Sequence, residues 1–282
     1  KQLTEIIVVD NGSTDSTLSI VASYAVRLMS ETSIPTSYAA RNLGISSATG
    51  DVVAMTDADC VATADWLTQL IAPLADDPTA GVVLGAIEDA VPESLAEEFT
   101  ARVRPFAAPT VRGLRSVLTA NVAIRTTTLR DAGCFDEQLP TAGDIDLGWR
   151  LQQDGVGIRD APAAKVFHRH RSTFRGVFAQ FRRYGLSEIL LTTLYQGNGG
   201  SLTAGDQWRR MLRQMRAMAS YVAGFFLRSG LSVFRGFDRR YVLWPLFLLA
   251  AESGNVIGKL GGLVATRYYR RNPYANPRIV RK

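Results

Sequence analysis

Two aspartates, Asp57 and Asp59, follow the apolar run Val52–Thr56 and are the side chains of this sequence best placed to do chemistry. Alternate residues of an extended chain point to the same side, so both carboxylates would face one spot. Carboxylates that share a spot repel each other unless a proton or a cation lies between them. A hard divalent cation that carries a diphosphate satisfies this arrangement. The pair therefore predicts a metal and diphosphate site.

The two histidines and the two cysteines offer further ligand atoms. His168 and His170 alternate in a short segment, so their imidazoles share a side if the segment is extended. His168 follows an apolar pair and is the better candidate to complete a metal shell or to contact the diphosphate. Cys60 and Cys134 lack CxxC spacing and predict no structural zinc site, which leaves reduced thiols of a cytosolic protein.

The elements that must position these residues alternate between strands and helices. This order predicts an α/β fold with an open, mostly parallel sheet flanked by helices on both faces. Ligands of such sheets bind beyond the carboxyl ends of the strands, where Asp10, Asp57 and Asp59 lie. The expected strands are Glu5–Asp10, Ile34–Tyr38, Val52–Thr56, Val82–Ile87, Val117–Ile124 and Ala164–His168, and the expected helices are Asp15–Met29, Ala39–Thr49, Ala64–Leu74, Glu93–Val111, Thr127–Ala132 and Asp144–Asp154.

Composition and charge divide the chain. Its 282 residues are 46% hydrophobic, which favours a packed core over disorder. The net charge is +6, and arginine dominates after Asp160, so the C-terminal part is expected to meet a phosphate-bearing substrate, a nucleic acid or a lipid surface, unless it is a solvated basic face. No nucleic-acid motif is present, and we expect no nucleic-acid partner. We expect a catalytic domain over 1–190, a linker over 196–201 and a helical extension over 191–282.

Two apolar runs in the extension, Met218–Leu227 and Tyr241–Ala251, are shorter than the roughly 20 residues that cross a bilayer. Two readings stay open for them: helices lying on a membrane surface, or a helical subdomain packed on the sheet. We expect a cytoplasmic protein, attached at the inner face of the cell membrane if the first reading holds.

Seven motifs occur in a fixed order and together resemble the family 2 glycosyltransferases. Besides Asp57-Ala58-Asp59, they are Val8–Asp15, Arg41–Gly44, Ala48–Asp51, Leu118–Arg125, Gly133–Arg150 and Gln180–Tyr184. The resemblance implies the GT-A fold, which is Rossmann-like, with a C-terminal helical extension here. It also implies inverting, metal-dependent transfer of a sugar from a nucleotide-diphosphate sugar to a hydroxyl of a glycan or lipid-linked acceptor, as in polysaccharide biosynthesis of the cell envelope.

The resemblance also implies roles for single residues. Asp144 is the expected general base, and Asp59 with His168 the expected ligands of Mg²⁺ or Mn²⁺. Asp57 would face the ribose or a metal-bound water, and Arg183 would clamp the diphosphate. The remaining assignments are nucleotide-sugar binding by Asp10, Asn11, Arg41, Asp57 and Arg183, and acceptor binding by Asn121, Asp146, Trp149, Gln180 and Tyr184.

Each of several assignments has a structural alternative. Asp10 is also a potential helix cap with Ser13, and Asp146 a residue that favours the helix dipole. Trp149 fits the core equally well. The alternative for the set at Gln180, Arg183 and Tyr184 is an amphipathic helix with a basic outer face.

The sequence departs from the family pattern in three places. Family members begin with an extra strand, so we expect that an N-terminal piece is missing before Lys1. The base segment reads Gly143-Asp144 where Glu-Asp is common, and Tyr184 stands where processive members have Trp. Two other functions remain: a sugar nucleotidyltransferase, and a catalytically silent protein that binds nucleotide sugars.

Overall fold

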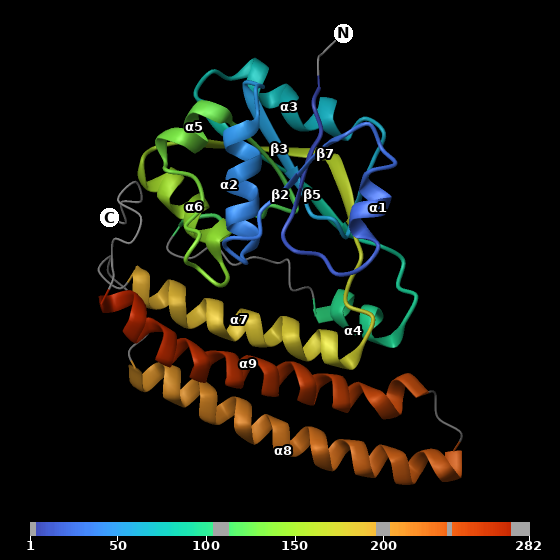
Figure 1. Cartoon of the computed structure of the whole chain (residues 1–282). Helices are drawn as coiled ribbons and strands as arrows, with labels where there is room; N and C mark the ends of the chain where they lie inside the picture. The colour runs from blue at the N-terminus through green and yellow to red at the C-terminus, as the bar shows by residue number, and fades with distance from the viewer. Residues whose placement is uncertain (1–3, 104–112, 196–203, 236–238, 272–282) are drawn as a thin grey trace. The chain divides into compact units, whose positions relative to one another are not determined.

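The computed structural model describes residues 4–103, 113–195, 204–235 and 239–271 of the chain (Figure 1). These residues form two compact units, one from 4–88 and 113–167, the other from 89–103 and from 168 onward. The predicted linker at 196–201 lies outside the described residues. The predicted domain boundary at residue 190 stays a prediction.

The first unit is built on two sheets of strands. A five-stranded sheet has the order β3-β6-β5-β7-β4, and β1 and β2 form a separate parallel pair. The strands are β1 (Ile7–Asp10), β2 (Arg27–Ser30), β3 (Val52–Thr56), β4 (Cys60–Ala62), β5 (Ala80–Asp89), β6 (Asn121–Arg125) and β7 (Gly157–His168). The strand predicted at Val52–Thr56 has these bounds, whereas β4 was not predicted and β7 begins seven residues before the predicted Ala164.

The expectation of a mostly parallel sheet is wrong, because the large sheet is mixed. β6 runs antiparallel to β3, with Val52 opposite Arg125, and antiparallel to β5, with Val82 opposite Ile124. A continuous apolar run is typical of a parallel strand covered on both faces. Here the apolar run of β6 is buried on both faces although both neighbouring strands are antiparallel to it. Burial, and not strand direction, therefore explains the apolar composition of β6.

Helices cover this sheet. They are α1 (Thr17–Val21), α2 (Ser37–Ser47), α3 (Trp66–Asp76), α5 (Thr126–Asp131) and α6 (Gly143–Gln153). The side chains of Leu70 and Leu74 on α3 join Val83 and Ala123 of the central strands in one apolar cluster. Burial of such side chains contributes about 1.5–3 kcal/mol each, so this cluster holds β3, β5 and β6 in place beneath the loops that follow them.

The segment from Asp15 to Met29 is not one helix, as its periodicity had predicted. Only Thr17–Val21 is helical, and the chain turns and enters β2 at Arg27. Leu18 and Ile20 are 42% and 55% exposed, so the apolar face of a longer helix would have nothing to pack against. A helix of this length is marginal without such packing.

The strand predicted at Ile34–Tyr38 is also wrong. The Thr36 hydroxyl accepts a hydrogen bond from the backbone N–H of Ala39 at 3.2 Å and caps α2, which begins at Ser37. A side-chain oxygen at this position satisfies one of the unpaired N–H groups of a helix start. The cap therefore places the beginning of α2, and with it Tyr38 and Arg41, earlier than the hydrophobic pattern suggested.

The second unit is helical. Its helices are α4 (Leu95–Val103), α7 (Phe174–Leu194), α8 (Ala204–Arg235) and α9 (Arg239–Arg271). The helix predicted at Glu93–Val111 is thus present as α4, and its last residues lie outside the described ones. Gly254 and Gly258 let α9 approach α7 closely, because a Cβ on Gly258 would overlap the carbonyl oxygen of Arg182. Within the described ranges, no helix is both long and apolar enough to cross a membrane.

Candidate active site

The two aspartates of the Asp57-Ala58-Asp59 segment lie in a turn between β3 and β4. The backbone N–H of Cys60 donates to the carbonyl oxygen of Asp57 at 3.0 Å, and β3 ends before this turn. The strand alternation that would turn both carboxylates to one spot is therefore absent, although the charges of both act on the thiol of Cys60. Asp57 pairs with Arg41, and Asp59 takes part in a different cluster.

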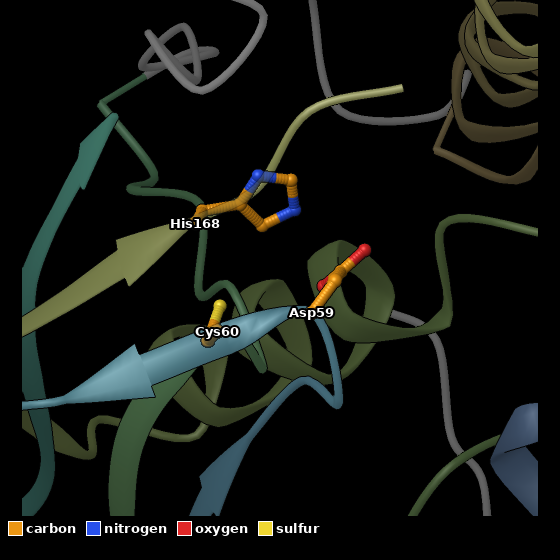
Figure 2. A group of neighbouring side chains, drawn as sticks. All are labelled: Asp59, Cys60 and His168. Carbon is orange, nitrogen blue, oxygen red and sulfur yellow. The ribbon is translucent and has the colours of Figure 1, made fainter. Parts of the chain in front are cut away.

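That cluster is formed by Asp59, Cys60 and His168 (Figure 2). One potential ligand atom of each residue lies within 4.8 Å of the others. Cys60 begins β4, His168 is the last residue of β7, and these two strands are neighbours in the sheet. A carboxylate oxygen and an imidazole nitrogen suit Mn²⁺, whereas the added sulfur suits a softer ion such as Zn²⁺. The cluster brings the two predicted ligands Asp59 and His168 together, and metal binding by them stays a prediction.

The thiol of Cys60 is protonated when no cation is near. Burial raises the pKa of Cys60 to about 11, and the negative charges of Asp57 and Asp59 add to this effect. A thiol must lose its proton to become a strong metal ligand, and a cation in the cluster would favour that loss. Cys60 was not predicted as a site residue, although its position next to Asp59 was visible in the sequence.

The Arg41–Asp57 pair rests on two aromatic rings. The Arg41 Nη2 atom lies 2.9 Å from the Asp57 Oδ1 atom, and both side chains are partly exposed. The guanidinium also lies over the rings of Tyr38 and Phe135, which stack on each other with 5.8 Å between centroids. These contacts hold the cation and the carboxylate side by side at the mouth of the site.

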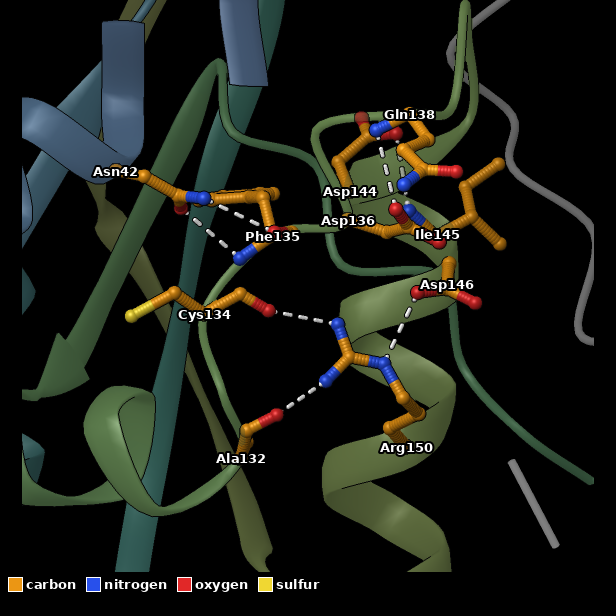
Figure 3. Close-up of polar contacts among 10 residues, drawn as sticks. All are labelled: Asn42, Ala132, Cys134, Phe135, Asp136, Gln138, Asp144, Ile145, Asp146 and Arg150. Atoms are coloured by element: carbon orange, nitrogen blue, oxygen red, sulfur yellow. Dashed lines mark hydrogen bonds and ion pairs between the residues drawn. The ribbon is translucent and has the colours of Figure 1, made fainter. Parts of the chain in front are cut away.

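Asp144 is in the first turn of α6 and is partly buried. Burial raises the pKa of Asp144, the positive charge of Arg41 opposes this effect, and the negative charge of Asp57 supports it. The backbone N–H of Ile145 donates to its Oδ1 atom at 2.9 Å (Figure 3). A carboxylate with a raised pKa close to an Asp–Arg pair is typical of a proton acceptor in an enzyme.

The residues before Asp144 explain its position. Ala142 has a left-handed backbone with φ of 64°, a conformation that side chains rarely adopt. A Cβ on Gly143 would lie 2.8 Å from the ring of Tyr38. The ring therefore occupies the place of the glutamate that is common at this point of the base segment.

Asp146 forms a buried ion pair instead of facing a cavity. Its carboxylate is 0% exposed and accepts from the Arg150 Nε atom at 2.9 Å (Figure 3). The same guanidinium donates to the carbonyl oxygens of Ala132 and Cys134 at 2.5 and 2.7 Å. The pair thus fixes the loop before α6, and the predicted acceptor contact of Asp146 stays a prediction. Arg150 lay within a predicted motif but received no role.

Asn121 and Trp149 are also buried, at 2% and 5% exposure. The Asn121 amide donates to the carbonyl oxygens of Ala86 on β5 and Ala164 on β7, and it accepts from the Trp66 indole at 2.8 Å. It therefore ties three strands together near the ends that carry the site. The burial of Trp149 agrees with the core alternative, and an acceptor contact of either residue stays a prediction.

Asp10 and Asn11 order the loop after β1. The backbone N–H groups of Gly12 and Ser13 donate to the Asp10 carboxylate at 3.1 and 3.2 Å, and hydrogen bonding by Ser13 lowers the pKa of Asp10. The Asn11 amide donates to the carbonyl oxygens of Glu31 and Ile34. Asp10 thus closes a turn and does not cap α1, and nucleotide binding by both residues stays a prediction.

Gln180, Arg183 and Tyr184 lie on α7 of the second unit. The Gln180 amide donates to the Tyr184 hydroxyl at 2.9 Å, as their spacing predicts for one helix face. Gln180 is buried and Arg183 is exposed. Their roles toward donor and acceptor stay predictions.

Comparisons with known proteins show which family the N-terminal part of the chain resembles. The family model described as Glycosyl transferase family 2 matches residues 1–111. This segment of the chain is similar to members of glycosyl transferase family 2. The match includes the Asp57-Ala58-Asp59 turn, Arg41 and Tyr38, but not the helix that carries Asp144.

Two curated glycosyltransferases are similar to a longer part of the chain. The pre-mycofactocin glycosyltransferase of Mycobacterium tuberculosis is 32% identical over 184 residues, which cover 59% of this chain and 38% of that protein. The glycosyltransferase AglE of Haloferax volcanii is 28% identical over 161 residues, which cover 55% of this chain and 53% of that protein. The chain thus spans about 38% to 53% of the length of these relatives.

A solved structure supports the fold. The mannosyltransferase PcManGT from Pyrobaculum calidifontis, in complex with GDP-Man and Mn²⁺, matches 89% of this chain and 77% of its own with a TM-score of 0.56 and 22% identity. At this identity the likeness shows the shared fold, an α/β GT-A-like unit with a helical C-terminal region.

Proposed function

We propose that this protein is an inverting glycosyltransferase that moves a sugar from a nucleotide-diphosphate sugar to a hydroxyl of a glycan or lipid-linked acceptor. One observation supports this most directly: the donor set of Asp59, Cys60 and His168 adjoins Asp57, whose charge acts on the partly buried Asp144. Candidate ligands for a diphosphate-binding cation and a candidate base are thus linked through one carboxylate. The similarity of residues 1–111 to family 2 and the Mn²⁺ and GDP-Man in the PcManGT structure support the donor class.

In this proposal Asp144 takes the proton from the acceptor hydroxyl as its oxygen attacks the anomeric carbon. A single displacement of this kind inverts the configuration of the sugar. A positioned base typically contributes about 10²–10⁴-fold to the rate, provided that it is ionised. Arg41 opposes the effect of burial on Asp144 and so keeps more of the carboxylate ionised near neutral pH.

Asp59 and His168 would hold Mn²⁺ or Mg²⁺ together with the donor diphosphate, with the Cys60 thiol beside them. The cation, when bound, supplies positive charge that stabilises the diphosphate as it leaves. Arg41 and Asp57 border this cluster and are proposed to contact the nucleotide, together with Asp10 and Asn11 of the loop after β1. We also propose that Arg183, Gln180 and Tyr184 contact substrates, which their common helix face supports.

A thermal-shift panel of nucleotide-diphosphate sugars with Mn²⁺ tests the donor. A true donor stabilises the folded protein by about 2.7 kcal/mol at a hundred times its dissociation constant, and the stabilisation should vanish in EDTA. Asp59→Asn should lose this metal-dependent shift, and Asp51→Asn, an exposed aspartate before β3, is the matched control. Unchanged stabilisation in chelator would contradict the metal assignment.

Turnover separates the remaining functions. A glycosyltransferase consumes the donor that stabilises it, and Asp144→Asn should suppress that reaction. A catalytically silent binding protein would show the thermal shift without turnover in either form. A sugar nucleotidyltransferase would instead release pyrophosphate from a nucleoside triphosphate and a sugar phosphate.

We further propose a role in polysaccharide biosynthesis at the inner face of the cell membrane. The basic and apolar helices of the second unit support this location. Fractionation of cells that express the protein tests it, and recovery only in the soluble fraction at low salt would contradict it.

A further inference from the structure

Helix α8 carries an apolar stripe on its exposed side. Leu212, Met215, Val222 and Phe226 are 51%, 51%, 39% and 68% exposed, and Ala219 lies between them in the sequence. Their spacing of three and four residues places them on one face of the helix. The stripe is centred about 120° around the helix from Gln214, whose side chain bonds to residues of α9. The stripe therefore lies beside the face of α8 that packs inside the unit.

Helix α9 carries a second stripe, made of Ile257, Leu260 and Val264, which are 48%, 43% and 72% exposed. These residues also follow a spacing of three and four. They lie away from Gly254 and Gly258, which face α7. Two neighbouring helices of one unit therefore each expose an apolar row.

Hydrogen bonds between the helices fix how the two stripes are oriented. The Gln214 amide donates to Glu252 at 2.8 Å and to Asn255 at 3.0 Å, and Lys259 donates to Gln214 at 3.1 Å. The two helices run antiparallel (Figure 1). Successive residues of an α-helix are rotated by about 100° around its axis. Counted from the contact residues, this rotation places both stripes on the same side of the antiparallel pair α8–α9, the helical hairpin. They form one apolar face, which we name the hairpin face and define as the seven exposed residues of the two stripes.

Arginines border the hairpin face. Residues 209–229 of α8 contain five arginines and no aspartate or glutamate. Arg209, Arg213 and Arg216 are exposed and lie on the flank of α8 next to the stripe. An exposed helix with large apolar side chains on one face and arginine on the next is typical of a helix that lies in the interface of an anionic membrane.

We propose that the hairpin face docks on an anionic lipid bilayer surface, with the apolar stripes in the acyl boundary and the arginines at the headgroups. Charge complementarity selects this occupant. A second copy of the chain would bring two arginine-rich flanks together, which costs free energy, whereas anionic headgroups attract them. The absence of a spanning helix among the described residues agrees with a surface position. The inference does not depend on sugar transfer.

Vesicle flotation tests the proposal. The chain is mixed with vesicles of phosphatidylcholine alone, or of phosphatidylcholine and phosphatidylglycerol in equal parts, without nucleotide sugar or metal. We expect flotation with the anionic vesicles only, and release by high salt, because the arginine contribution is screened. Absence of flotation with both vesicle types would overturn the proposal, whatever the protein does to sugar donors.

Matched variants locate the surface. Phe226→Ser should weaken vesicle binding about tenfold, because the variant lacks the aromatic side chain that would enter the acyl boundary. Val91→Ser, at a residue that is 87% exposed outside the hairpin, should not. Arg213→Gln with Arg216→Gln should weaken binding about twentyfold, and the exposed α7 pair Arg175→Gln with Arg182→Gln should have little effect.

Two results would overturn the assignment of this face. Vesicle binding that Phe226→Ser leaves unchanged would place the lipid contact elsewhere. A concentration-dependent dimer that Phe226→Ser disrupts, together with no flotation, would show that the face joins two copies of the chain. Light scattering of the same samples distinguishes these cases.

Discussion

Two segments of this protein have the same Asp-x-Asp spacing and different environments. In the turn after β3, Asp57 pairs with Arg41 and Asp59 adjoins Cys60 and His168, and both aspartates are partly exposed. In the first turn of α6, Asp144 is partly buried near the charges of Arg41 and Asp57, and Asp146 is fully buried in an ion pair with Arg150. The spacing brings carboxylates together, and the neighbours decide what each one does.

The comparison assigns opposite costs to the four residues. A carboxylate that binds a cation or takes a proton must stay accessible, and its negative charge must lack a full set of hydrogen-bond and ion-pair partners. Such a charge destabilises the fold. A carboxylate that fixes a loop must be fully compensated. Substitution of Asp144 should therefore lower activity more than stability, and substitution of the ion-paired Asp146 should lower stability.

Asp144→Asn should produce the largest change in activity. We expect kcat to fall about 10²–10⁴-fold, because an amide cannot accept the proton. The melting temperature at neutral pH should rise. The pKa of Asp144 is raised in the folded state, so its protonated form contributes stability in full below the unfolded pKa, and this contribution is lost as pH rises through the folded pKa. At higher pH the fold must hold an unfavourable negative charge, which asparagine lacks.

Kinetics and thermal melts at neutral and acid pH check this prediction. The stabilisation by Asp144→Asn should shrink on acidification, as the native carboxyl gains its proton. A variant that is inactive and also less stable at neutral pH would mean that Asp144 is a structural residue.

Asp146→Asn should do the reverse. Removing one partner of a buried pair leaves the Arg150 guanidinium uncompensated and costs about 3–5 kcal/mol of unfolding free energy. The matched control is Asp160→Asn in the exposed pair with Arg115, which should cost about 0–1 kcal/mol. Urea denaturation of both variants gives the comparison, and equal losses would show that the Asp146–Arg150 pair is not buried as described.

Arg41 and Asp57 should shift the pH dependence of activity in opposite directions. Activity requires ionised Asp144 and so decreases as pH falls through its raised pKa. Arg41→Gln removes a charge that lowers this pKa, so the acid limb should move to higher pH. Asp57→Asn removes a charge that raises it, so the limb should move to lower pH. Profiles of kcat/KM for both variants check the signs, and shifts in the same direction would refute the coupling.

Much of the fold was predictable because local patterns carry it. The run at Val52–Thr56 and the glycine-bounded helix at Asp144–Asp154 correspond closely to β3 and α6. The direction of β6 was not predictable, since its apolar run is equally compatible with parallel and antiparallel neighbours. The helix at Asp15–Met29 failed because periodicity does not show whether a partner surface exists.

The site was predictable in its residue types but not in its pairings. The structure brings Asp59 near His168 and Asp57 near Arg41, which lie far apart in the sequence. The stacked rings of Tyr38 and Phe135 and the ion pair of Arg150 had no sequence signal, because only tertiary packing brings them to these partners. Cys60 was visible next to Asp59 in the sequence. It received no role because Mg²⁺ and Mn²⁺, the predicted cations, prefer oxygen ligands to sulfur.

Cys60→Ser should produce the smallest effect and sharpen the contrast between the two segments. Thiolates favour Zn²⁺ over Mg²⁺ or Mn²⁺, so the variant should lose Zn²⁺ affinity on the order of tenfold and retain most of its Mn²⁺ affinity. Zn²⁺ must displace the thiol proton, and the pKa of Cys60 is raised to about 11. Zn²⁺ affinity of the native protein should therefore increase with pH, more steeply than that of the variant.

Competition titrations at several pH values measure both affinities, with Cys134→Ser as the control that keeps the cluster intact. Equal losses of Zn²⁺ and Mn²⁺ would mean that Cys60 acts by supporting the turn after β3, whose N–H donates to Asp57. An unchanged Zn²⁺ affinity would leave Asp59 and His168 as the metal ligands. In either case the turn after β3 would be a site for a hard cation, and Cys60 would have a structural role, as Asp146 has in its ion pair with Arg150.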